Sequence, residues 1–273
     1  MTRKLWLAVA WILPLVLTAQ APPVVPPDLI TMDEEPHHHL ALHNDYVNVF
    51  KIEVAPGDSI VLHRHAHDAV AIAIGDQEVT VGVPGKPDVH QKNVDGQVRL
   101  QRADYIHSTH VDDSSPYHTV AVELLQPQGN PRNLCAPVLA GQPLNCPEVS
   151  PDTSPAKQIN QPEFESDATR VQIVRLLAHQ KVDIGHLSYF QLIVLLDRAS
   201  ISPISGNGPD QLLRPGDFVW FDKGKPARLL NNNGNEEVRY VEIAISPSDE
   251  FRQPVSVLGE RPLSGHVVKI GTR

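Results

Sequence analysis

The sequence is poor in aromatic residues and in basic charge. Only 5% of its 273 residues are aromatic, so the stacking platforms that bind single-stranded nucleic acid are not expected. Lys and Arg number 23 against 32 Asp and Glu, which gives a formal net charge of −9. Because phosphate backbones and anionic lipids attract proteins through positive charge, neither nucleic acid nor an anionic membrane surface is an expected partner.

Several signatures of common enzyme classes are also missing. The sequence has no Gly-x-Ser-x-Gly nucleophile elbow. It has no phosphate-binding P-loop and no dinucleotide-binding glycine pattern. A metal ion is therefore the one cofactor that the sequence indicates.

Long hydrophobic runs are confined to the N-terminus. Arg3 and Lys4 precede an apolar run from Leu5 to Leu17, and residues 19–21 (Ala-Gln-Ala) have the small-x-small pattern of a cleavage site. Residues 1–21 therefore predict an export signal and a periplasmic or secreted protein. The run is too short for a comfortable membrane span, so no stable span is expected unless the signal stays uncleaved.

Cysteine is equally scarce. The chain has two, Cys135 and Cys146, close together in a stretch rich in Pro, Gly and Asn. In the oxidising compartment that an export signal implies, two such neighbours favour a disulfide bond that closes a short loop.

The remaining sequence has the texture of short β-strands. Runs rich in β-branched residues alternate with turn sequences such as Pro-Gly-Asp at 56–58, and no long amphipathic helix is evident. The expected strands are 46–54, 59–62, 69–74, 78–83, 97–100, 119–125, 171–177, 190–197, 217–221 and 238–245. Short strands at close spacing predict an all-β sandwich or barrel.

The strand pattern is interrupted at residues 128–160 and then resumes in a second half that resembles the first. The two halves align at an offset of about 120 positions, with Gly96 on Gly216 and the strand at 120–124 on the region of 240–244. The expected organisation is an export signal (1–21), a Pro-rich linker (22–36), a first β-domain (37–127), a linker with both cysteines (128–160), a second β-domain (161–249) and a tail (250–273).

Histidines mark the first domain. His63 and His65 are separated by one residue in an apolar, alternating segment. Residues two apart in a strand lie on the same face, so the two imidazoles are expected to point to the same place.

The spacing around these histidines resembles the two motifs of the cupin superfamily. Gly57, five residues and then His-x-His match the first motif. Gly96 and His107 stand at the intervals of the second motif, in which Arg102 and Asp104 replace the usual Pro and Gly. The resemblance implies a β-barrel of the double-stranded β-helix or jelly-roll type.

The second half resembles the same family with a weaker site. Gly216, Gly224 and Asn231 stand at second-motif positions, but Ala227 takes the place of the histidine. Residues 184–186 (Ile-Gly-His) replace His-x-His. The resemblance therefore implies two tandem cupin barrels, a bicupin, with one metal-competent barrel and one degenerate barrel.

The resemblance also implies a metal site. His63, His65 and His107 are the expected ligands of one divalent ion, and imidazole suits Fe, Mn, Zn or Ni. The glutamate that usually completes the first motif falls at Ala69 or Val70, neither of which coordinates metal.

Three other residues stay open as alternatives. His67 and Asp68 are candidates for a fourth ligand, and His110 is an alternative to His107. The same three residues, His67, Asp68 and His110, are candidate acids or bases for catalysis. By contrast, the histidine-rich stretch at 37–43 and the acidic run at 33–35 are expected to be solvated surface.

Two functions fit these observations. The first is an exported metal-dependent enzyme, dioxygenase-like or isomerase-like, that acts on a small organic molecule. The alternative is a non-catalytic protein that binds a metal or a small ligand and has a partly vestigial site. Either a monomer with two pseudo-symmetric barrels or a homodimer is expected.

Overall fold

The structure is a computed structural model that describes residues 29–112, 115–147, 157–185, 187–204, 208–246 and 251. Strands and turns make up these residues, which confirms the all-β expectation. Within the described residues, no helix is long and apolar enough to cross a membrane. The expected export signal lies outside the described residues, as do His186 and all but one residue of the tail beyond Asp249.

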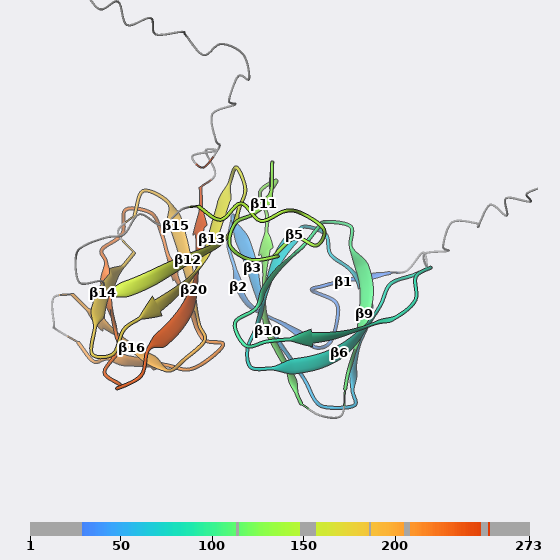
Figure 1. Ribbon diagram of the computed structural model, residues 1–273, viewed down its shortest axis with the longest axis horizontal. Helices are drawn as coiled ribbons and strands as arrows, with labels where there is room; N and C mark the ends of the chain where they lie inside the picture. The colour runs from blue at the N-terminus through green and yellow to red at the C-terminus, as the bar shows by residue number, and fades with distance from the viewer. Residues whose placement is uncertain are drawn as a thin grey trace, which may run out of the picture.

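The chain folds into two barrels that lie side by side (Figure 1). The strands of the first barrel are β1 (Ile30–Thr31), β2 (His38–His43), β3 (Val47–Val54), β4 (Ser59–Arg64), β5 (Asp68–Ala73), β6 (Gln77–Gly82), β7 (Val89–Asn93), β8 (Val98–Gln101), β9 (Ile106–Val111) and β10 (Tyr117–Leu124). They form two five-stranded sheets, in the orders β1-β4-β9-β6-β7 and β2-β3-β10-β5-β8.

The second barrel repeats this plan with two further sheets. Its strands, with the short β11 that precedes them, are β11 (Arg132–Asn133), β12 (Gln158–Glu165), β13 (Thr169–Leu176), β14 (Lys181–Ile184), β15 (Phe190–Leu195), β16 (Ala199–Pro203), β17 (Gln211–Leu213), β18 (Phe218–Phe221), β19 (Arg228–Asn231) and β20 (Val238–Ile245). The sheet orders are β11-β12-β13-β20-β15-β18 and β14-β19-β16-β17.

Matching turns in the two barrels support the internal repeat. Gly96 and Gly216 have φ angles of 79° and 81°. Asp104 has a φ of 64°, and Gly224, 120 positions later, has a φ of 70°. The left-handed backbone favours glycine, and Asp is among the few other residues that adopt it readily. The turn is therefore kept in the first barrel although its glycine is replaced.

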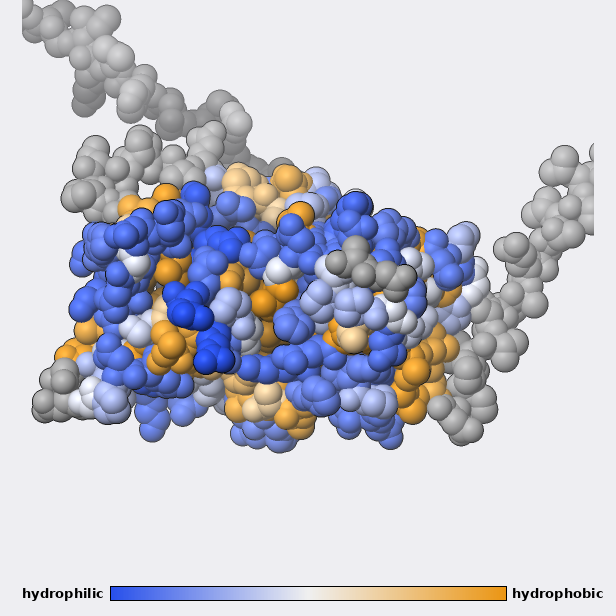
Figure 2. Space-filling model, turned by 90° about the horizontal axis from the view of Figure 1, so that it is seen from below, coloured by the Kyte–Doolittle hydropathy of each residue, from blue (hydrophilic) through white to orange (hydrophobic). Residues whose placement is uncertain are grey.

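A shared hydrophobic core joins the barrels. The sheet with β10 packs against the sheet with β20. Along both strands, every second side chain points into this core. Val120, Val122 and Leu124 of β10 meet the second barrel, and Thr119 and Ala121 do not belong to this core. The partners from β20 are Val241, Ile243 and Ile245. Apolar residues gather in this interface, and the surface seen in Figure 2 is largely hydrophilic with smaller hydrophobic patches.

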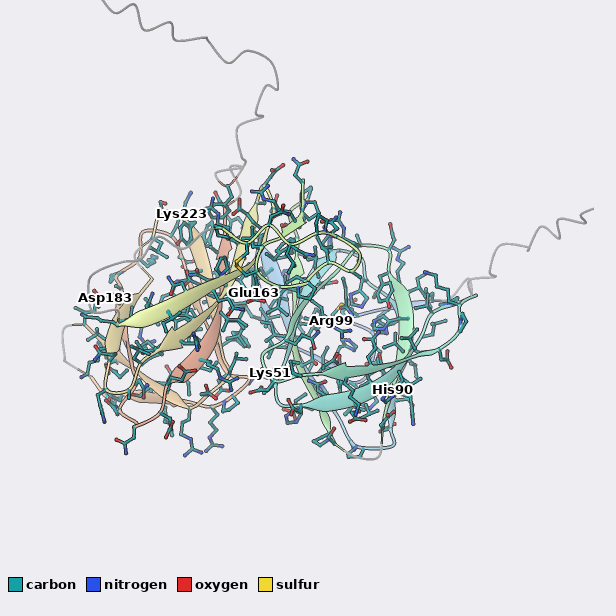
Figure 3. All side chains as sticks on the ribbon, in the orientation of Figure 1. Lys51, His90, Arg99, Glu163, Asp183 and Lys223 are labelled. Atoms are coloured by element: carbon teal, nitrogen blue, oxygen red, sulfur yellow. A yellow bond between two sulfur atoms is a disulfide. The ribbon has the colours of Figure 1, made fainter. Side chains whose placement is uncertain are left out.

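Ion pairs tie the same two sheets together. The Arg239 guanidinium donates to Asp197 at 2.9 Å and to Asp95 of the first barrel at 2.6 Å. Lys51 lies between the barrels (Figure 3) and donates to Asp217 at 2.9 Å. These contacts place charges at the edges of the apolar interface, where water still reaches them.

The segment that carries the cysteines lies across both barrels: the Cys135 amide donates to the Pro162 carbonyl of β12 at 2.9 Å, and the residues between the cysteines contact the first barrel. Cys135 and Cys146 form a disulfide bond. Between them, the Val138 carbonyl accepts a hydrogen bond from the Leu100 amide at 3.0 Å. The buried Asn133 side chain holds Leu139 with bonds of 2.7 and 2.9 Å. This disulfide loop, residues 135–146, thus covers part of the first barrel.

Candidate metal centre

Two strands of the first barrel bring three histidines together. β4 carries His63, and His65 follows directly after the last residue of β4. β9 carries His107, which lies opposite His63 in the pairing of β4 with β9. The ring centroids of His63 and His107 are 4.6 Å apart, and each of the other two pairs is 5.1 Å apart. All three side chains are buried, with exposed fractions of 0, 2 and 6%.

The ring nitrogens of this group converge. Nε2 of His65 and Nε2 of His107 lie 2.9 Å apart. Nδ1 of His63 donates to the Val61 carbonyl at 2.9 Å, so in the neutral ring Nε2 carries the lone pair. Nε2 of His63 is buried and has no hydrogen-bond partner. One nitrogen from each ring can be chosen so that all three lie within 4.8 Å of one another.

This arrangement fits a metal ion. Two imidazole nitrogens that bind one ion at about 2.1 Å each lie about 3 Å apart, close to the separation of the His65 and His107 nitrogens. A buried nitrogen without a partner loses free energy unless something binds to it. A cation at this point would satisfy the lone pair of His63 and separate the facing nitrogens.

Burial also sets the charge of the rings. Desolvation, with a smaller contribution from the neighbouring imidazoles, lowers the pKa of His65 to about 3. Desolvation lowers the pKa of His63 to about 4 and that of His107 well below its usual range. All three rings are therefore neutral near pH 7, which is the form that coordinates metal.

The N-terminal histidine stretch contributes to this region, so the expectation of a solvated surface is wrong there. His38 opens β2 and is buried, with its ring centroid 4.8 Å from that of His63. Glu35 is only 1% exposed, and its carboxylate lies 2.7 Å from Nδ1 of His38. The sequence offered no motif for either residue, because both precede the barrel strands that the pattern predicted.

Glu35 is held as a charged group. Burial alone would raise its pKa, but hydrogen bonds from the His38 and His37 rings and from the His37 amide lower the pKa to about 2. The Val61 amide donates to the same carboxylate at 3.2 Å. Glu35 therefore fixes His38 beside His63 and also binds the backbone of β4, the strand that carries His63.

The structure does not bring the remaining candidates to the three histidines. His67 is exposed, because β4 ends at Arg64 and the alternation that would have turned His67 inward ends with it. His110 is exposed on the other face of β9, with Nδ1 2.9 Å from the Ser59 hydroxyl. The expectation of His67 or His110 as a ligand, acid or base in this centre is therefore corrected.

Asp68 has a structural role instead. Its carboxylate accepts a hydrogen bond from the Ala103 amide at 2.8 Å and lies 3.1 Å from Nε of Arg102. It therefore holds the turn that precedes β9. β5 pairs with β8 and β10 without a bulge that would turn Asp68 toward the histidines, so Asp68 does not complete the ligand set.

Comparisons with known proteins address the fold. No protein-family model and no curated protein sequence matches the chain. Solved structures do match. A salicylate 1,2-dioxygenase from Pseudaminobacter salicylatoxidans aligns with a TM-score of 0.52 and 13% identity, over 74% of this chain and 72% of that one.

Two further structures align over similar lengths. AerE from Microcystis aeruginosa has a TM-score of 0.48 and 11% identity, over 78% of this chain and 98% of that one. A cupin 2 conserved barrel domain protein from Leptotrichia buccalis has a TM-score of 0.48 and 8% identity, over 75% and 86%.

The chain has the cupin fold. At 13% identity the likeness concerns the fold alone, so the chemistry must be argued from the residues of this chain.

The first cupin barrel is hollow beside the histidines. A cavity of about 740 Å³ is lined by His107, Tyr105 and Arg99, and by small side chains such as Ala71 and Ala73. Residues 137–140 of the disulfide loop also line it. The Tyr105 ring stacks on His107 with centroids 4.7 Å apart. A cavity of this size suits a small organic ligand.

The second cupin barrel is filled by its own side chains. Leu230 and Tyr240 are almost fully buried in its interior, together with Phe221 and Ile201. Ala227 stands where the repeat places His107 in the first barrel. Among the described residues, the one other group with potential ligands this close is Glu78, His90 and Asp112, which lies on the first barrel, with His90 exposed.

Proposed function

We propose that the protein is a metal-dependent enzyme that acts on a small organic molecule bound in the first cupin barrel. One observation carries this proposal. Three buried, neutral imidazoles converge, and one of them, His107, lines a cavity. Nε2 of His63 and Nδ1 of His65 have no hydrogen-bond partner within the described residues. Such a group is costly to maintain unless it binds something.

His63, His65 and His107 would hold the ion. Fe, Mn, Zn and Ni are all compatible with imidazole ligands, and three protein ligands leave positions for water or substrate. A bound ion supplies Lewis acidity and, in the case of iron, redox chemistry. The shared fold with a salicylate 1,2-dioxygenase supports dioxygenation as the first reaction to test, followed by isomerisation.

The chain's own residues would prepare the substrate. Apolar side chains and the disulfide loop form part of the cavity wall, beside polar residues such as Gln91, and would shield part of the cavity from water. Burial raises the pKa of Tyr105 above its ordinary value, so its hydroxyl stays protonated and can donate a hydrogen bond to a substrate beside His107.

Export is part of the same proposal. The disulfide bond between Cys135 and Cys146 supports an oxidising compartment, in agreement with the predicted N-terminal signal. The two barrels that pack through one core support a monomer, because the pairing is already made within one chain.

Reconstitution tests the proposed function. The purified protein is stripped of metal, loaded separately with Fe(II), Mn, Zn or Ni, and assayed for O₂ consumption and for isomerisation with a panel of small aromatic and aliphatic acids. We expect turnover with one or two of the metals and its loss in His107→Ala. His110→Ala is the matched control, because His110 lies on the same strand but faces outward. Ligand binding without any metal-dependent turnover would instead support the non-catalytic alternative.

A further inference from the structure

The first barrel has a positively charged side chain in the wall of its cavity. β8 alternates, with Val98 and Leu100 buried in the core between the barrels. Arg99 must therefore face the other way, and it lines the cavity that contains His107. Figure 3 shows the Arg99 label inside the first barrel, whereas Lys51 lies between the barrels.

Arg99 has no acidic partner among the described residues. No Asp or Glu lines the cavity. The second arginine of the lining, Arg102, is already paired with Asp68. Arg99 donates from Nη1 to the amide oxygen of Gln91, a neutral group that leaves the charge uncompensated.

This environment disfavours the free guanidinium. Burial lowers the pKa of Arg99 from its ordinary value, although an arginine stays protonated at any physiological pH. A partly buried charge without a counter-ion costs free energy, and an anion that enters the cavity would recover that cost.

We propose that Arg99 binds the carboxylate of a small organic acid and thereby directs the rest of that molecule to the three histidines. This inference rests on the proposed function, because it names the substrate class of the same site. The planar guanidinium matches a carboxylate with two parallel hydrogen bonds.

The neighbours of Arg99 favour the same ligand. Tyr105 and Tyr117 line the cavity, and both interact electrostatically with Arg99. Their hydroxyl groups can donate hydrogen bonds to a carboxylate. The Gln91 amide group, whose oxygen already accepts from Arg99, has N–H donors to offer a second carboxylate oxygen.

Arg99 lies in the same cavity as a residue of the metal centre. Tyr105 lines the same cavity as Arg99, and its ring stacks on His107. Arg99 and His107 line the same cavity of about 740 Å³. A molecule the size of a single-ring or short-chain acid can therefore contact both.

A carboxylate fits better than a phosphate. No lysine lines the cavity, and Arg99 is its one cation without an acidic partner among the described residues. Phosphate groups are usually held by several cations or by clustered backbone amides at a helix N-terminus. The other polar groups of the lining are side-chain amides and hydroxyls, which suit a neutral remainder of the ligand.

Paired probes test this inference in metal-free protein, so that direct binding of a carboxylate to an ion cannot contribute. Isothermal titration calorimetry compares benzoate with benzamide, and hexanoate with hexanamide. We expect at least one acid to bind ten or more times more tightly than its amide. Arg99→Met should reduce this ratio to about one, and Arg99→Lys should retain part of it. Arg175→Met, at a partly exposed position on the second barrel where Arg175 pairs with Glu237, is the control and should leave the ratio unchanged.

The outcomes separate the two proposals. Equal binding of acid and amide by the wild type, or an unchanged ratio in Arg99→Met, would overturn the role of Arg99. Arg99→Gln replaces Arg99→Met if the latter does not fold, as judged by circular dichroism. Metal content is measured in parallel on metal-loaded protein: a wild type that prefers the acid but holds no metal overturns the proposed function and leaves the carboxylate site standing.

Discussion

Glu35 brings a carboxylate to the histidine centre from a part of the chain where no motif predicted one. The expected position for a glutamate was Ala69 or Val70, and both are fully buried apolar residues of β5. Glu35 instead reaches the region through His38, whose ring lies beside that of His63. A carboxylate that bonds directly to a metal-binding histidine tunes the affinity of the site, and Glu35 lies one step further away, behind His38.

Glu35→Gln is therefore expected to weaken metal binding by less than the roughly 10- to 100-fold loss typical of a carboxylate bonded directly to a metal ligand, because Glu35 acts on His63 only through His38 and the Val61 backbone. The measurement is a competition titration against a chromophoric chelator with Zn or Fe(II). Glu35→Asp should rescue part of the affinity, since it keeps the charge. Glu53→Gln, an exposed position on β3, is the control. Wild-type affinity in Glu35→Gln would show that the pair has a folding role alone.

At the residue scale, the sequence predicted the histidines more readily than their surroundings. His63, His65 and His107 follow from motif spacing and from the two-residue period of a strand. Arg99 does not, because a single arginine in a short alternating strand is usually solvent-exposed. Its inward direction depends on the second barrel, which occupies the face where Val98 and Leu100 point.

At the element scale, the register between β4 and β9 decides which histidines meet. The pairing sets His63 opposite His107, and an irregularity between Ile60 and His63 shifts the register along β4. His110, three residues after His107, then faces outward. Strand spacing alone left both residues open, because it does not reveal where a ladder is interrupted.

Three of the strands missed by the sequence pattern, β7, β9 and β12, share a reason. β7 and β9 carry polar residues on faces that meet solvent or the cavity, so their hydrophobic alternation is weak. β12 is likewise polar over its first half. Strands with strong apolar alternation, such as β10 and β20, were predicted close to their observed limits.

The disulfide loop is the element whose removal is most easily tested. It closes 11 positions of chain and covers the cavity with residues 137–140. The double variant Cys135→Ser with Cys146→Ser is expected to lose about 3 kcal/mol of folding free energy, from the chain entropy of a loop this short. Thermal or urea unfolding measures the loss. Reductant should have the same effect on the wild type and none on the variant; equal stability of all forms contradicts the expectation.

On the scale of the whole molecule, the two cupin barrels depend on each other. β10 of the first barrel presents Val120 and Val122 to β20 of the second, so separation would expose a large apolar face. The repeat in the sequence predicted two barrels, but not this packing. Alternating apolar residues indicate that one face of a strand is buried. They do not indicate whether that face lies against the barrel interior or against a neighbouring sheet.

A charge in this interface tests that dependence. Val122 is 0% exposed, so Val122→Asp buries an unpaired carboxylate and is expected to cost about 4 kcal/mol or to prevent folding. Val122→Ala, with a loss of about 2 kcal/mol, serves if the first variant does not fold. Val94→Asp, at a position 61% exposed, should change stability by less than about 0.5 kcal/mol. Independent melting of two barrels would contradict the shared core.

Metal stoichiometry shows whether His63, His65 and His107 bind an ion. Elemental analysis is done on untagged wild type, on the triple variant His63→Ala, His65→Ala and His107→Ala, and on His110→Ala, each after loading and removal of excess ion. We expect a metal content of one ion per chain in the wild type and in His110→Ala, and of less than about a tenth of an ion per chain in the triple variant. Wild type without bound metal, or equal metal in all three proteins, would contradict it.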